Sequence, residues 1–229
     1  QFTDQQNGHF FIRQSFTLLN DDILDKLNDD LSILSKDLNA ELLLSDIQSS
    51  MNTIMLVSKF DHCLNDLLYR VRNNSLNLNI KAIISNHIIA KEIADFSNIP
   101  FYYIPIDKSN KEEQELKIKN LIIKNQIEMI VLARYMQVLS EEFTNEFEGK
   151  IINIHHSFLP SFKGAKPYHQ AFERGVKVIG ATAHYVSSDL DEGPIIEQDT
   201  QEVDHEMMPN NLVAIGRDIE SRVLYKALK

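Results

Sequence analysis

The sequence predicts an α/β protein in which a mostly parallel sheet follows a small α+β unit. From residue 53 onward, short runs that are apolar on both faces alternate with helical patterns, which is typical of a parallel sheet covered by helices on both sides. Before residue 50, strand-like alternation flanks one amphipathic helix. The 229 residues suffice for one large core or two unequal domains. We therefore expect one domain at residues 1–50 and a second at 51–229.

The first unit is predicted from two kinds of pattern. Residues 9–19, HFFIRQSFTLL, alternate between two sides, as in a half-buried strand. Residues 21–38 place leucines three and four positions apart, which indicates an amphipathic helix. Residues 41–47, ELLLSDI, again resemble a strand. We expect these elements to form a strand–helix–strand unit that ends near Ser50.

The second unit is predicted from the order of its elements. Apolar runs indicate strands at residues 53–58, 79–85, 101–106, 128–134 and 151–155. Helical patterns occupy residues 62–72, 88–96, 110–125 and 141–148, and a last helix begins near residue 209. In an open α/β sheet, ligands bind beyond the carboxyl ends of the strands. The polar segments in that position read SKFDHC, ARYMQVLS, HHSFLPSFKGAKP and SSDLDEGP.

Composition and charge argue against several classes of protein. The net charge of −10, without clustered basic residues, disfavours a nucleic-acid surface. The single cysteine, Cys63, permits no internal disulfide and suits a reducing cytoplasm, so we expect it to be a small core residue. No apolar run reaches the roughly 20 residues that span a bilayer, so we expect no membrane partner. The sequence begins at Gln1, without an initiator Met or a signal peptide, which is what part of a longer gene product would give.

The chemistry is expected at the end of the run IINIH. Asn153 and His155 lie two positions apart, so on a strand they project to one side, while His156 projects to the other. A carboxamide and an imidazole can both donate to an oxygen that becomes negative during attack on a carbonyl. Asp191, in a turn with Gly193, offers a carboxylate that could hold a water or take its proton. This set predicts hydrolysis or acyl transfer without a nucleophilic side chain.

Other interpretations of these residues stay open at this point. A strand-end histidine can be a packed structural residue, which is the preferred interpretation for His156, and an aspartate in an acidic turn can simply be solvated. His155, His156 and His169 could supply three zinc ligands, although no metal-binding spacing such as CxxC is present. Ser157 and Ser161 lack a GxSxG context, and no GxGxxG or Walker sequence follows a strand. We therefore expect neither a metal nor a bound cofactor.

At these residues the chain resembles the family of enzymes that use formyltetrahydrofolate. Their hallmark is N-I-H followed by S-x-L-P-x-F-x-G, here Asn153 to Gly164, and later D-x-G-P-I, here Asp191 to Ile195. The similarity covers roughly residues 53–229 and implies a Rossmann-like formyltransferase fold. Within the family, residues 155–186 are most similar to the deformylases, because the transferases usually have Pro where His156 stands.

The resemblance implies roles for individual residues. Many relatives carry Arg at position 137, so only a backbone contact carries over to this chain there. The implied residues are Asn153, His155 and Asp191 as the catalytic set; Met136, Gln137, Val138 and Leu139 as the loop that receives the pterin ring, largely through backbone groups; Val186, Leu190 and Gly193 in the loop that closes over it; and Thr182 and His184 as residues that orient the imidazole.

One departure from the transferases indicates the acceptor. Glycinamide ribonucleotide transformylases have a glycine-rich turn after the first strand, which holds the substrate phosphate at a helix N-terminus. Here the turn, residues 58–62, reads SKFDH and has a carboxylate but no glycine. The resemblance therefore implies hydrolysis of 10-formyltetrahydrofolate to tetrahydrofolate and formate, in one-carbon metabolism linked to purine biosynthesis. The alternatives are a glycinamide ribonucleotide transformylase and a non-catalytic, ACT-regulated folate-binding protein.

Residues 1–50 resemble the second half of an ACT domain, a small unit that senses amino acids. The leading strand and helix of such a domain are absent from this sequence. The resemblance implies an amino-acid effector and a homo-oligomer. The residues themselves identify neither the effector nor the number of subunits.

Overall fold

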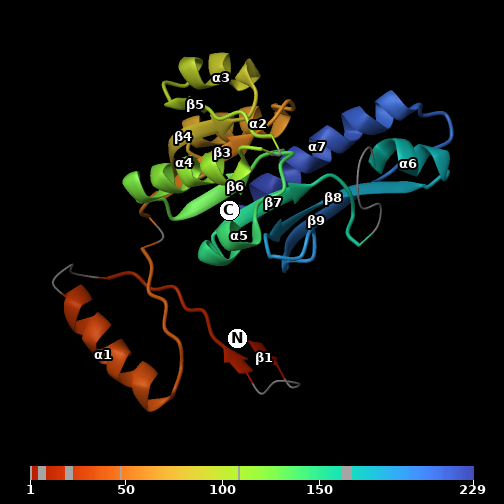
Figure 1. The fold of residues 1–229 in the computed structure, drawn as a ribbon. Helices are drawn as coiled ribbons and strands as arrows, with labels where there is room; N and C mark the ends of the chain where they lie inside the picture. The colour runs from red at the N-terminus through yellow and green to blue at the C-terminus, as the bar shows by residue number, and fades with distance from the viewer. Residues whose placement is uncertain (1, 5–8, 19–22, 47, 108, 161–166) are drawn as a thin grey trace. The chain divides into compact units, whose positions relative to one another are not determined.

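The chain divides into two compact units, Gln1–Ile47 and Gln48–Lys229. The computed structural model describes residues 2–4, 9–18, 23–46, 48–107, 109–160 and 167–229 (Figure 1). Among the helices described, none is long and apolar enough to cross a membrane.

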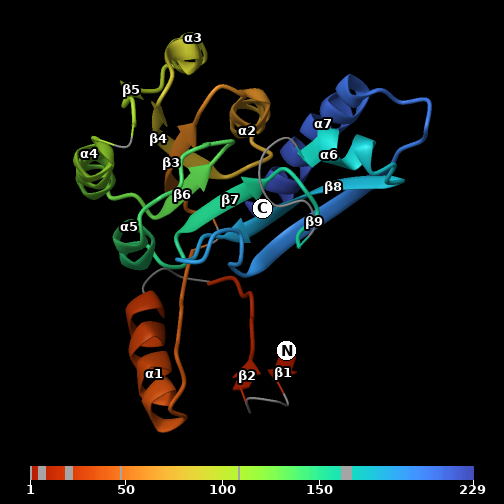
Figure 2. The same ribbon diagram turned by 45° about the vertical axis from the view of Figure 1, so that its right-hand side comes forward.

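The larger unit is built on a seven-stranded sheet with the order β5-β4-β3-β6-β7-β8-β9 (Figures 1 and 2). The strands from β5 to β7 run parallel, and β8 and β9 are antiparallel to their neighbours at one edge. This confirms the predicted α/β fold with a mostly parallel sheet. The strands are β3 (Met51–Val57), β4 (Leu78–Ser85), β5 (Phe101–Tyr103), β6 (Met129–Leu132), β7 (Ile151–His155), β8 (Val178–Tyr185) and β9 (Ile195–Glu202).

Helices cover both faces of this sheet (Figure 2). One buried cluster packs α2, α3, α6 and α7 against one face, and a second packs α4 and α5 against the other. The helix predicted at residues 88–96 is divided into a 3-10 turn and a short α-helix. The helices are α2 (His62–Arg72), η2 (Ile88–Ala90), α3 (Lys91–Phe96), α4 (Lys111–Lys124), α5 (Glu141–Glu146), α6 (Pro167–Glu173) and α7 (Pro209–Ala227).

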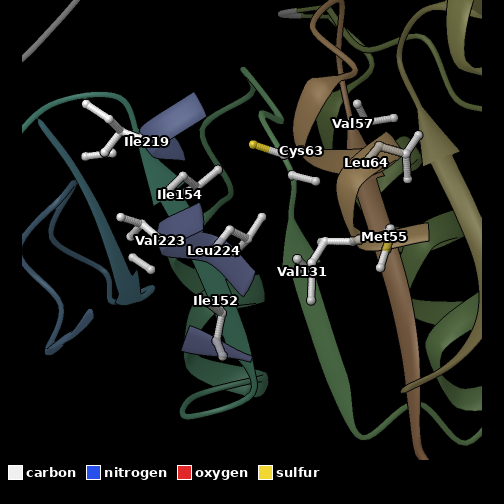
Figure 3. Packing of buried hydrophobic residues seen from close by; sticks show 14 of the residues in the cluster. Met55, Val57, Cys63, Leu64, Val131, Ile152, Ile154, Ile219, Val223 and Leu224 are labelled. Carbon is white, nitrogen blue, oxygen red and sulfur yellow. The ribbon is translucent and has the colours of Figure 1, made fainter. Parts of the chain in front are cut away.

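The core explains why helix α7 is held firmly against the sheet. Cys63 is fully buried, as predicted for a small core residue. A Cβ atom on Gly216 of α7 would lie only 2.1 Å from the ring of Tyr168, so α6 and α7 approach closely at that point. Figure 3 shows the apolar contact on this face, where α2 and α7 meet β3, β6 and β7 through Met55, Val57, Cys63, Leu64, Val131, Ile152, Ile154, Ile219, Val223 and Leu224.

The smaller unit differs from its prediction. It contains β1 (Phe2–Asp4), paired antiparallel with β2 (His9–Phe11), and the helix α1 (Leu24–Asp37). The strand predicted at residues 9–19 ends at Phe11, so its predicted extent is wrong, and residues 41–46 form no strand, so that prediction is wrong; residues 19 and 47 lie outside the described residues.

The physical reason is the absence of neighbours within this unit. None of the residues of α1 is buried, and Phe10, Phe16 and Leu38 are each more than half exposed, at 53%, 54% and 67%. A strand needs an adjacent strand to satisfy its backbone groups, and the described residues of this unit give β2 only β1. Alternation identifies side chains that could share a face, but it does not supply the partner strand.

Candidate active site

Asn153 and His155 project from the carboxyl end of β7 on the side predicted by the alternation. Ile152 and Ile154 point to the opposite face, where both are buried in the core. His155 is only 5% exposed. His156 follows the strand, and its ring lies in an edge contact with Tyr168 of α6, with centroids 6.5 Å apart. The two adjacent histidines therefore face different surroundings.

Asp191 reaches His155 from the turn between β8 and β9. Its Oδ1 lies 3.2 Å from Nδ1 of His155 and 3.9 Å from Nε2 of His184. The hydrogen bond with His155 lowers the pKa of Asp191, against the opposing effect of burial, so the group is a carboxylate at neutral pH. Asp191 has a left-handed φ of 59°, which few residues other than Gly, Asn and Asp adopt readily. The strained backbone thus aims a negative charge at the imidazole.

Asn153 is oriented by a second histidine, His184 of β8. The Nδ1 of His184 lies 2.8 Å from the carbonyl oxygen of Tyr185, to which it must donate. Burial lowers the pKa of His184, so the ring is neutral and its Nε2 is an acceptor. That Nε2 lies 3.2 Å from Nδ2 of Asn153. Since Nδ2 donates one N–H to His184, the orientation of the amide is fixed, and no other residue in the described part of the chain accepts from Nδ2.

The free nitrogen of His155 is the most reactive feature of this site. Its Nδ1 is engaged by Asp191, whereas its buried Nε2 has no hydrogen-bond partner among the residues that the structure describes. A buried polar atom without a partner is uncommon and is typical of groups that act on a ligand. Nε2 of His155 and the amide of Asn153 are thus two potential donors, and Asp191 supplies a carboxylate bound to the same imidazole.

Thr182 makes hydrogen bonds to the turn that follows the two histidines. Its hydroxyl donates to the carbonyl of Ser157 and accepts from the backbone N–H of Leu159, both at 3.0 Å. It also accepts from the side-chain amide of Gln198 at 2.9 Å. These contacts hold the backbone next to the two histidines, and the expected role of Thr182 in orienting the imidazole stays a prediction. Residues 161–166, which carry the end of the S-x-L-P-x-F-x-G motif, lie outside the described residues.

The loop expected to receive the pterin lies at the carboxyl end of β6. The N–H of Met136 donates to Oγ of Ser58 at 2.9 Å, and that hydroxyl donates to Oδ1 of Asn86 at 2.7 Å. Leu139 is buried in the core, whereas Met136 and Val138 are exposed and Gln137 is partly exposed. The loop therefore has a fixed base and an exposed apolar tip, which suits contact with a flat ring.

The second expected loop, residues 186–193, is tied down at both ends. Val186 packs against the core, and its N–H donates to the carbonyl of Ile151 at 2.9 Å. A Cβ atom on Gly193 would lie 1.8 Å from the carbonyl oxygen of Tyr185, so no larger residue fits there without moving the backbone. Leu190, between these anchors, is 62% exposed. An apolar side chain is thus presented beside Asp191.

Comparison with known proteins identifies the family. Residues 51–228 match the Formyl transferase family. A formyltetrahydrofolate deformylase of a Corynebacterium species is 46% identical over 230 residues, which cover 100% of this chain and 80% of that protein. The crystal structure of a formyltetrahydrofolate deformylase from Pseudomonas putida has a TM-score of 0.93 at 45% identity, covering 99% of this chain and 81% of that chain. The chain belongs to the formyltetrahydrofolate deformylase family.

Transferases of the same fold are less similar. A phosphoribosylglycinamide formyltransferase from Anaplasma phagocytophilum has a TM-score of 0.70 at 31% identity, over 79% of this chain and 86% of that chain. The resemblance to deformylases that the sequence carries in residues 155–186 is therefore confirmed. The roles assigned to individual residues stay predictions.

A second polar cluster lies close to the deformylase site and was missed from the sequence. Glu220 of α7 is 1% exposed, and its carboxylate accepts hydrogen bonds from Nε2 of His62 and from the hydroxyl of Tyr168, both at 2.7 Å. Nε of Arg134 lies 3.2 Å from the same carboxylate. We name these four residues the Glu220 cluster. They lie far apart in the chain, on three helices and the loop after β6, so no local sequence motif could have predicted the cluster.

The three histidines that could have supplied zinc ligands do not lie together, whereas another group of possible ligands does. Among the described residues, the groups of His62, Cys63 and Glu220 lie within 4.8 Å of one another, whereas His155, His156 and His169 form no such group. We assign no metal to the first group, because the guanidinium of Arg134 already balances its carboxylate. Burial also raises the pKa of Cys63 well above the usual value, which disfavours a thiolate ligand.

Proposed function

We infer that this protein hydrolyses 10-formyltetrahydrofolate to tetrahydrofolate and formate. The observation that carries the inference is the state of His155: Asp191 holds its Nδ1, while its buried Nε2 has no hydrogen-bond partner among the described residues. Such a set can polarise a formyl group and activate water, and the membership of the deformylase family supplies the substrate.

The proposed reaction assigns one task to each side chain. Asn153 donates an N–H to the formyl oxygen. Asp191 orients a water molecule and accepts its proton as the water oxygen bonds to the formyl carbon. His155, protonated and held by Asp191, donates from Nε2 to the oxyanion. When the bond between carbon and N10 breaks, the oxyanion re-forms a carbonyl and N10 takes the electron pair and a proton from His155. Formic acid leaves and loses its proton to water, and the proton held by Asp191 passes back to His155.

Water as the acceptor is supported by the turn after β3. Phe60 occupies this turn, and the guanidinium groups of Arg134 and Arg217 each lie 5.4 Å from its ring centroid. The turn contains no glycine, and Asp61 would repel a phosphate. An acceptor amine that carries a phosphate therefore lacks the site that a glycine-rich turn provides.

The test is incubation of the purified chain with 10-formyltetrahydrofolate alone. We expect equal amounts of formate and tetrahydrofolate, and no turnover by the His155→Ala variant. Formyl transfer that requires glycinamide ribonucleotide would instead identify a transferase. Tight binding without turnover would identify a folate-binding protein. Unchanged activity after treatment with a chelator would support our proposal that the hydrolysis needs no metal or cofactor.

We further propose that residues 1–50 form part of an ACT-like unit that binds a small amino acid and joins copies of this cytoplasmic chain into a homo-oligomer. The support is the row of exposed apolar side chains on α1 and β2, which need a partner to be covered. Light scattering of the full-length gene product, with and without a panel of amino acids, tests the proposal. A monomer that responds to none of them would contradict it.

A further inference from the structure

The Glu220 cluster contains one buried cation and one buried anion. Arg134 is 7% exposed and Glu220 is 1% exposed. Burial raises the pKa of Glu220, but the hydrogen bond from His62 and the charge of Arg134 more than offset that effect, and the net shift is downward. Burial raises the pKa values of both Cys63 and Tyr168, so the thiol and the phenol stay neutral. Arg134 and Glu220 therefore carry the permanent charges of this cluster.

The interaction between Arg134 and Glu220 is electrostatic more than directional. Nε of Arg134 lies 3.2 Å from Oε2 of Glu220, within ion-pair distance. Yet neither Nε nor Nη1 of Arg134 makes a hydrogen bond of acceptable geometry to any described residue. The contact between Arg134 and Glu220 is therefore an attraction between charges and not a hydrogen bond. A guanidinium buried in this way would be an uncompensated charge if Glu220 were neutral.

This charge pair is connected to His155 through the rings of Tyr168 and His156. Tyr168, bonded to Glu220, contacts the ring of His156, and that ring lies 5.3 Å from the ring of His155. Burial and then the positive charge of Arg134 lower the pKa of His156 to about 3, so a neutral ring separates His155 from the pair. On its other side, His155 faces Asp191 and then His184.

Arg134 also begins the loop that we expect to bind the pterin. It is the second residue after β6, has a left-handed φ of 64°, and its carbonyl accepts a hydrogen bond from the N–H of Ser58. An arginine whose backbone is in the left-handed region is strained, and this conformation persists only when the surrounding structure stabilises it. The carboxylate of Glu220 supplies that hold from helix α7.

We propose that Glu220 and Arg134 are positioning residues of the hydrolase: Glu220 fixes the guanidinium at the start of the 136–139 loop and offsets its positive charge behind His155. The proposal rests on the proposed hydrolysis. It adds a second carboxylate that acts on the active site through charge and without touching the substrate. A positive charge disfavours protonation of a nearby imidazole, and a negative charge favours it.

The pH dependence of kcat tests the role of charge. In Glu220→Gln, the guanidinium is left unbalanced, so we expect the kcat–pH profile to move to lower pH by at least about half a unit. In Arg134→Met, the carboxylate remains with its two donors, so the profile should move to higher pH by a similar amount. The double variant removes both charges, and its profile should return to within about 0.2 units of the wild type.

The control is Arg222→Met, which breaks an exposed ion pair on the same helix. Arg222 donates from Nε to Asp199 at 2.7 Å, and both side chains are partly exposed. This variant should leave the profile in place. Circular dichroism at each pH measures the folded fraction of each variant. Because the two single variants should shift the kcat–pH profile in opposite directions, either one alone tests the proposal if the other folds poorly.

Two results separate this proposal from the proposed function. If the wild type does not release formate, the hydrolysis itself is wrong. If the wild type is active but the folded single variants keep its profile, or if the double variant is displaced as far as either single variant, the cluster is merely structural. Opposite shifts that cancel in the double variant are the result we expect.

Discussion

The two polar clusters of this protein use similar side chains in opposite ways. Around Glu220, the carboxylate accepts hydrogen bonds from His62 and Tyr168 and lies beside the guanidinium of Arg134, and the residue is only 1% exposed. Around Asp191, one carboxylate oxygen meets His155, the side chain keeps 13% exposure, and Nε2 of His155 has no partner among the described residues. The first cluster is closed, and the second is open to a ligand.

The difference shows how burial alone fails to identify a catalytic group. Glu220 is more buried than Asp191, yet its hydrogen bonds are complete and it cannot take a proton from water without losing them. Asp191 is bound through Oδ1 and Asn153 through Nδ2, and the residues that the structure describes form no other hydrogen bond with either side chain. We therefore expect variants of the open cluster to change kcat most, and variants of the supporting residues to change it less.

The largest effect is expected for Asp191→Asn. The substitution is nearly isosteric but removes the negative charge that holds His155 and the attacking water. A neutral amide also no longer favours the doubly protonated imidazole that the proposed reaction uses to protonate N10. Loss of acid–base assistance should lower kcat by at least about a hundredfold, while KM changes much less. Steady-state formate release, at equal folded fraction, measures both.

A smaller effect is expected for His184→Leu. The substitution removes the acceptor that orients Asn153, so the amide of Asn153 is free to turn and present its oxygen to the formyl group. We expect kcat to fall about tenfold, less than the 10²–10³-fold typical of losing an oxyanion donor outright. Asn153→Ala should show that larger loss. If His184→Leu has no further effect in the Asn153→Ala background, orientation of the amide is its role.

The pterin loop allows a matched pair of variants whose effects should appear in KM. Ser58→Ala removes the acceptor of the Met136 N–H and should raise KM by roughly three- to tenfold, with a smaller change in kcat. Gln137→Ala leaves the backbone contact intact, so KM should change by less than about twofold. A larger effect of Gln137→Ala than of Ser58→Ala would place a side-chain contact at position 137.

The smallest effect on kcat, within about threefold, is expected for His156→Gln, since the ring of His156 does not touch the substrate in the proposed reaction. Its effect should appear in stability. The folded-state pKa of His156 is about 3, below the ordinary value of 6.5, so the unfolded state binds the extra proton. The contribution of the neutral His156 ring to the free energy of unfolding is therefore fully present above pH 6.5 and is lost as the pH falls toward 3.

Urea unfolding of the wild type and His156→Gln at two pH values measures this linkage. Between pH 7.5 and pH 5.5, the wild type should lose about 1.4 kcal/mol relative to the variant. A constant difference between the two proteins would show that His156 is solvated. A loss of kcat greater than that of Asp191→Asn would show that the roles of the two histidines are reversed.

Much of the sheet and part of the site could be predicted from the sequence. Runs such as 53–57 are apolar on both faces because the strand is covered on both sides, and this pattern is local. The pair Asn153 and His155 follows from a two-residue period on a strand end. The meeting of Asp191 with His155 required the turn between two later strands, which the family resemblance indicated but spacing alone could not.

The remaining features depend on contacts that spacing does not encode. The Glu220 cluster joins residues 158 positions apart, and nothing in the helical stripe of α7 distinguishes Glu220 from a solvated glutamate. In the smaller unit, alternation at residues 9–19 predicted a full strand, but a strand forms only where another strand pairs with it.

The most direct test of the account is a double-mutant cycle between Asp191→Asn and His155→Ala in single-turnover hydrolysis of 10-formyltetrahydrofolate. If the carboxylate and the imidazole act as one unit, the double variant should be about as slow as the slower single variant. If the two losses multiply, Asp191 and His155 contribute independently, and the central claim that they form one catalytic pair is contradicted.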